Sequence, residues 1–163
     1  MLDEGQHARC VDAWLEGSGT GLAPDALLRL FEAALDAVWI RTNTTLGEVT
    51  LTAIAERVLH NASERFSLLW SLKIEPTRGI QCRELSDRIG SVEPAELREA
   101  IRFVLVELLT VLGNLTAEIL TPALHAEISK VTLSDAIRVE KRPLSQSAVP
   151  VNIESEEERS WRK

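Results

Sequence analysis

The sequence is poor in aromatic residues. It contains no tyrosine, and phenylalanine and tryptophan together make up 4% of its 163 residues. Strands favour aromatic and β-branched side chains, whereas a core built mostly from Leu, Ile, Val and Ala suits helices packed on helices. With 45% hydrophobic residues, the chain is large enough to bury such a core. We therefore predict an all-α protein.

The sequence also lacks the features of several functional classes. Cys10 and Cys82 stand outside any CxxC or Cys/His spacing, so we predict reduced thiols and no metal site. The formal net charge is −7, and no basic stripe is available to neutralise phosphates, so we expect no nucleic-acid partner. No export signal is visible, and the most apolar stretch, residues 101–124, contains charged residues. We expect a cytoplasmic protein without a membrane span.

Residues 94–130 carry the longest regular apolar pattern. At 100° per residue, two stripes of aliphatic side chains merge into one wide face, and no charged residue lies between Glu107 and Glu118. The pattern predicts one helix of about ten turns, bent near Pro122. A helix covered from one side needs a narrower apolar face, so we expect a second copy of the chain to cover part of it. The predicted homodimer contacts are Val104, Leu108, Val111, Leu112, Leu115 and Ile119.

The other helices are predicted before this one. Residues 24–40 are predicted to form an amphipathic helix opened by Pro24, and a Thr45/Glu48 capping box is predicted to open a second helix that reaches His60. Residues 61–70 either continue that helix or begin a third. Residues 71–82 fit a hairpin or a loop, and we favour the loop because an isolated hairpin is only marginally stable. The prediction is a helical bundle of four to five helices around one long helix in the C-terminal half.

The two ends of the chain are predicted to lie outside the bundle domain, which comprises residues 22–132. Residues 1–21 are predicted to be a short helix and a linker, because three glycines fall within residues 17–21. Residues 133–163 are predicted to be a disordered tail, because proline, serine and an acidic run replace the apolar pattern. The tail residues predicted to dock on a partner are Val149, Val151, Ile153 and Trp161.

Residues suited to chemistry are few. His7 falls in the N-terminal segment that we expect to be disordered, whereas His60 and His125 fall on predicted helices. Either of these two could serve as the axial ligand of a haem, and His125 could accept a phosphoryl group. No nucleophile elbow and no Cys/His signature is present. We therefore predict no catalytic residue and no cofactor.

Three functional hypotheses follow. The first is a regulatory or adaptor module that forms a homodimer through the long helix and binds a further, unidentified protein. The alternative is a sensor that holds a small molecule or haem between the long helix and residues 27–39. The third is phosphotransfer through His125. A helical bundle is compatible with all three, because a fold alone does not determine function.

Overall fold

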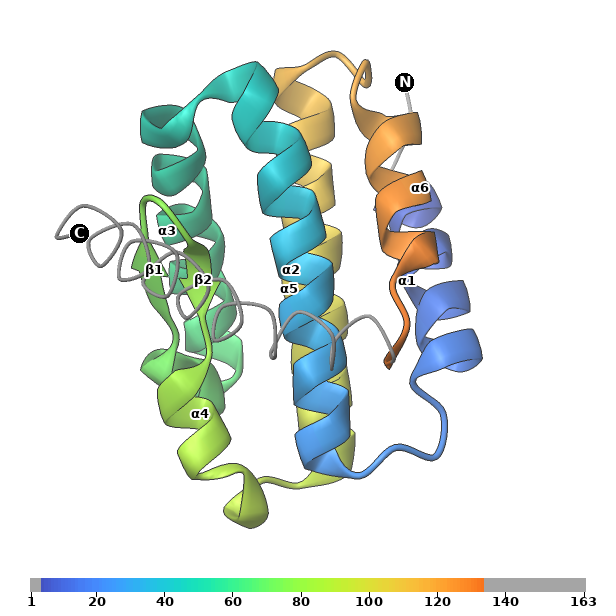
Figure 1. Cartoon of the computed structure of the whole chain (residues 1–163), viewed down its shortest axis with the longest axis vertical. Helices are drawn as coiled ribbons and strands as arrows, with labels where there is room; N and C mark the ends of the chain where they lie inside the picture. Colours follow the sequence, from blue (N-terminus) through green and yellow to red (C-terminus); the bar gives the residue numbers. More distant parts are fainter. Residues whose placement is uncertain (1–3, 134–163) are drawn as a thin grey trace, which may run out of the picture.

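A computed structural model describes residues 4–133 of the chain. This part is predominantly helical, which confirms the predicted all-α class (Figure 1). Its six α-helices are α1 (Glu4–Ser18), α2 (Pro24–Leu46), α3 (Glu48–Arg65), α4 (Arg83–Asp87), α5 (Pro94–Leu115) and α6 (Thr121–Lys130). Between α3 and α5 lie the 3-10 turns η1 (Ser67–Ser71) and η2 (Ile89–Ser91) and the strands β1 (Lys73–Glu75) and β2 (Gly79–Gln81).

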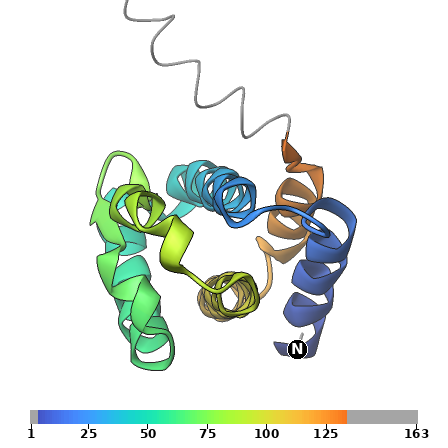
Figure 2. The ribbon, with the colours of Figure 1, turned by 90° about the horizontal axis from the view of Figure 1, so that it is seen from below.

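Helix α5 forms the centre of the fold. Viewed along the bundle, α1 and α6 lie on one side of α5, α3 lies on the other, and α2 covers a third side (Figure 2). Its wide apolar face is therefore covered within a single chain. Leu97, Ile101, Leu105 and Leu112 are each fully buried. Helix α1 adds Val11, Trp14 and Leu15 to the same core.

The prediction of one helix over residues 94–130 is wrong. α5 ends at Leu115, a turn follows, and α6 runs back antiparallel to α5 (Figure 1). Ala117 and Glu118, with φ angles of 50° and 66°, adopt the left-handed conformation that ends a helix. Pro122 bends nothing, because it lies in the first turn of α6, where a proline costs no helical hydrogen bond.

Two boundaries between the earlier helices also differ from the prediction. Thr45 belongs to α2, and Gly47, with a φ of 83°, separates α2 from α3 without any capping hydrogen bond from a side chain. The predicted capping box is therefore wrong. α3 continues without interruption through residues 61–63, where Ser63 Oγ donates a hydrogen bond to the Leu59 carbonyl oxygen at 2.6 Å.

Residues 73–81 form an antiparallel hairpin, not the loop that we favoured. Lys73 pairs with Gln81 and Glu75 pairs with Gly79. The hairpin is stable because it is not isolated. Ile80 is buried in the core, and Gly79 packs so closely on the indole ring of Trp39 on α2 that an added Cβ would lie 2.7 Å from it.

Residues 1–3 and 134–163 lie outside the described residues. Apart from Leu133, the predicted disordered tail, with its docking residues Val149, Val151, Ile153 and Trp161, falls in the second of these ranges. In the part that the structure describes, no helix combines the length and the apolar character needed to cross a membrane.

Candidate functional site at the turn between α5 and α6

The turn after α5 has a strained backbone. Ala117 and Glu118 are both left-handed although neither is glycine, and this conformation costs about 1–2 kcal/mol per residue. Hydrogen bonds hold it in place: the Glu118 N–H donates to the Gly113 carbonyl oxygen at 2.7 Å, and Thr116 Oγ1 donates to the Leu112 carbonyl oxygen at 2.8 Å. Such strain persists where the surrounding structure imposes it, and it is often found at functional sites.

The side chain of Glu118 folds back against the end of α5. Its Oε2 accepts a hydrogen bond from the hydroxyl of Thr121 at 2.6 Å, and only 17% of the side chain is exposed. Gly113 makes this position available, because a Cβ there would lie 2.8 Å from both carboxylate oxygens. The turn therefore directs a charged residue inward.

Two histidines meet the carboxylate from other helices. His7 of α1, which we had placed in a disordered segment, is 1% exposed. Its Nδ1 lies 3.0 Å from Nε2 of His125 on α6, and its Nε2 lies 3.8 Å from Glu118 Oε2. One of the two bonded nitrogens must donate and the other accept, so at least one imidazole is neutral. Burial, followed by the neighbouring His7, lowers the pKa of His125, and Glu118 opposes this shift.

The thiol of Cys10 lies beside this cluster but is not activated by it. Its Sγ is 3.9 Å from the carbonyl oxygen of His125. Burial raises the pKa of Cys10, and a hydrogen bond with Ser129 offsets part of that rise. Burial also raises the pKa of Cys82. Both cysteines are free, as predicted. At neutral pH they are protonated, and a protonated thiol is a poor nucleophile.

The outer side of the same turn is apolar. Ile119 is 78% exposed and Leu115 is 58% exposed, although both are large aliphatic residues. Val49, at the start of α3, is 85% exposed at the same end of the bundle, where α2 meets α3 and α5 turns into α6 (Figure 1). We call these three residues the apolar end.

The predicted dimer contacts divide into two groups. Val104, Leu108 and Leu112 are buried within one chain by its own helices, so the inference that they need a second copy to cover them is wrong. Val111 is half-buried. Leu115 and Ile119 remain exposed.

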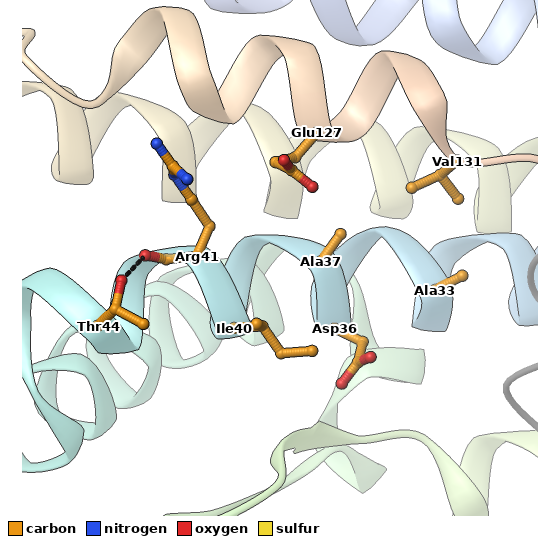
Figure 3. A pocket seen from close by; sticks show the side chains of 8 residues that line it. All are labelled: Ala33, Asp36, Ala37, Ile40, Arg41, Thr44, Glu127 and Val131. Carbon is orange, nitrogen blue, oxygen red and sulfur yellow. Dashed lines mark hydrogen bonds between the residues drawn. The ribbon is translucent and has the colours of Figure 1, made fainter. Parts of the chain in front are cut away.

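A groove separates α2 from α6 (Figure 3). Its volume is about 410 Å³. Neither candidate haem ligand lines it, because His60 is exposed beside Glu64 on α3 and His125 faces His7. The groove is lined by Ala33, Asp36, Ala37, Ile40, Arg41, Thr44, Glu127 and Val131.

The cluster of His7, His125 and Glu118 can perform little chemistry. Within residues 4–133, no three His, Cys, Asp or Glu side chains are arranged to hold a metal ion. Nε2 of His125 is occupied by His7, and the carboxylate of Glu118 lies in the same cluster. A carboxylate there would repel an incoming phosphate. The cluster joins α1, the turn and α6, which is a structural role.

A comparison of the chain with protein-family models, curated proteins and solved structures finds no match. A functional assignment therefore depends on the geometry of the residues described above.

Proposed function

We propose that the chain is a cytoplasmic protein–protein interaction module of a regulatory or adaptor kind, which forms a homodimer through its apolar end. The observation that carries this proposal is the orientation of the turn between α5 and α6. Glu118 points into the protein while Ile119, the next residue, is 78% exposed. Scattered apolar residues on a surface need no explanation, but three exposed at one end of the bundle favour a contact site there.

The charge distribution around the turn favours a second copy as the partner. Each chain carries a formal net charge of −7, so two copies repel one another over most approaches. The residues beside Leu115 and Ile119 are uncharged, because Asn114, Thr116 and Ala117 surround them and the carboxylate of Glu118 is turned inward. Two copies of the turn can therefore meet through Leu115 and Ile119 around a two-fold axis without opposing charges of the same sign, although Glu48 is exposed beside Val49.

The proposal retains Leu115 and Ile119 from the predicted interface and omits the residues that the bundle buries. The sensor alternative now depends on the groove between α2 and α6, because neither His60 nor His125 lines it. Phosphotransfer through His125 stays a prediction, and the neighbouring Glu118 argues against it.

Sedimentation velocity of the full chain tests the homodimer. We expect a dimer, with twice the chain mass of 18.1 kDa, whose dissociation constant is about 100 μM or lower. Such a constant corresponds to an association free energy of about 5.5 kcal/mol or more. The variant Ile119→Asp should sediment as a monomer with an unchanged circular dichroism spectrum, and Ile119→Gln should weaken the dimer less.

A matched control is Trp70→Asp. Trp70 is 65% exposed and follows α3 at the opposite end of the bundle, so this variant should dimerise like the wild type. A wild-type monomer throughout the concentration range, or equal loss of the dimer in Trp70→Asp and Ile119→Asp, would refute the proposal.

A further inference from the structure

The groove between α2 and α6 has an apolar floor and distinct ends. Ala33 and Ala37, one turn apart on α2, leave space beside α6, and Ile40 is 60% exposed on the next turn (Figure 3). Val131 lies at one end. At the other end, the side chain of Arg41 extends from α2 toward α6.

The chain leaves the described part of the protein beside this groove. The carbonyl oxygen of Val131 accepts hydrogen bonds from Trp14 Nε1 at 3.0 Å and from Ser18 Oγ at 3.5 Å. These bonds attach the end of α6 to α1. Leu133, two residues later, is the last described residue, so the C-terminal segment starts next to the Val131 end of the groove. A segment tethered this closely has an effective concentration in about the millimolar range.

We propose that residues 149–153 of the same chain occupy the groove in an extended conformation. In an extended chain, Val149, Val151 and Ile153 point to one side, and Pro150 favours the extended form in the residue before it. None of the residues that line the groove belongs to the apolar end, so the two proposals are tested with different variants.

The dimensions of the groove suit this occupant. Five extended residues span about 16 Å at about 3.3 Å each. The groove follows α2 from Ala33 to Thr44, which is also about 16 Å at 1.5 Å per helical residue. Residues 134–148 provide the connection, and a flexible chain of that length has a root-mean-square extension of about 20 Å.

Charge determines the direction of the proposed segment. Asp36 and Glu127 line the middle of the groove, and residues 149–153 carry no charge that would be repelled there. If Val149 lies at the Val131 end, Ile153 reaches the Arg41 end, and the acidic run over residues 154–158 emerges beside the guanidinium. The opposite direction would place this run at the Val131 end, where the nearby ammonium of Lys130 is already paired with Glu127 at 3.9 Å.

A spin label attached at position 152 of the full chain tests the proposal. The label is introduced as Asn152→Cys with Cys10→Ala, and the buried Cys82 is left in place. We expect strong paramagnetic broadening of the backbone amides of Ala37 and Ile40, and little for amides near Trp70. Ile40→Asp should abolish the broadening, and Arg41→Glu should reduce it.

Two controls identify the occupant. Trp70→Asp, which changes an exposed residue at the other end of the bundle, should leave the broadening unchanged. If Ile40→Asp alters the circular dichroism spectrum, Ile40→Ser replaces it. Mixing spin-labelled chains with isotope-labelled chains that carry no spin label separates broadening within one chain from broadening between two copies. Broadening in this mixture equal to that within one chain would assign the groove to a second copy and overturn the proposal, as would the absence of broadening at Ala37 and Ile40.

Discussion

Replacing Gly113 by alanine tests how the turn after α5 is held. Alanine in a helix is favoured over glycine by about 1 kcal/mol, so this change alone should stabilise α5. The new methyl group, however, would lie 2.8 Å from both carboxylate oxygens of Glu118. These oxygens end a flexible side chain, so the carboxylate moves and the helix does not.

The displaced carboxylate loses its 2.6 Å hydrogen bond from Thr121, whose side chain is buried. A hydrogen bond to a charged group contributes about 1.5–3 kcal/mol. We therefore expect Gly113→Ala to lower the free energy of unfolding by about 0.5–2 kcal/mol. In a Glu118→Ala background no carboxylate opposes the new methyl group. There, Gly113→Ala should raise the free energy of unfolding by up to about 1 kcal/mol.

Urea denaturation of the four chains in this double-mutant cycle measures the coupling. We expect a coupling energy of about 1.5–3 kcal/mol between positions 113 and 118. Gly17→Ala is the matched control, because Gly17 lies in α1 with nothing within 4 Å of its would-be Cβ. Its effect should be the same with and without Glu118. If Gly113→Ala also has the same effect in both backgrounds, Glu118 does not hold the turn.

Two further predictions concern His125 and Gly79. Burial lowers the pKa of His125 below its unfolded value of 6.5, so the unfolded chain binds the proton more readily, and stability should fall as the pH decreases below about 6.5. Urea midpoints measured between pH 8 and pH 5 should show this fall in stability, and His125→Gln should make the fall smaller. A fall of the same size in His125→Gln would show that His125 is not its cause. Gly79→Ala should destabilise the protein by about 2–4 kcal/mol, because φ is +86° and a Cβ would lie 2.7 Å from the Trp39 ring. Thermal unfolding measures this, and an unchanged midpoint would show that the hairpin does not pack on Trp39 as described.

The fold class could be predicted because the signal is local and periodic. In α5, the apolar residues recur with the helical period, and Leu97, Ile101 and Leu105 are buried as that period requires. The same rule, applied to α1, places His7 on the buried face, since His7, Val11 and Trp14 are spaced by four and three residues. The burial of His7 could therefore have been predicted, although its contact with His125 could not, because that contact depends on tertiary structure.

The break between α5 and α6 was only partly predictable from local preference, because Pro122 marks an interruption but not the residue at which α5 ends. Residues 116–120 include Ala117, Glu118 and Leu120, which are good helix formers. The turn that ends the helix combines a local hydrogen bond, from Thr121 to Glu118, with a contact across the fold, in which Glu118 lies 3.8 Å from His7. The hairpin shows the same limit, because its stability depends on the packing of Gly79 against Trp39, forty residues earlier.

The inner and outer sides of the α5–α6 turn are consequences of one backbone conformation. With Glu118 in the left-handed region, its side chain reaches Thr121, and the next residue, Ile119, faces outward. A continuous helix would instead place Glu118 and Ile119 by the helical period of the preceding residues. The hydrogen bond of Glu118 thus offsets part of the strain of the turn, and it fixes the position of the apolar residues that we propose as a contact surface. Because the proposed interface depends on this conformation, whatever stabilises the inner cluster also favours association through the apolar end.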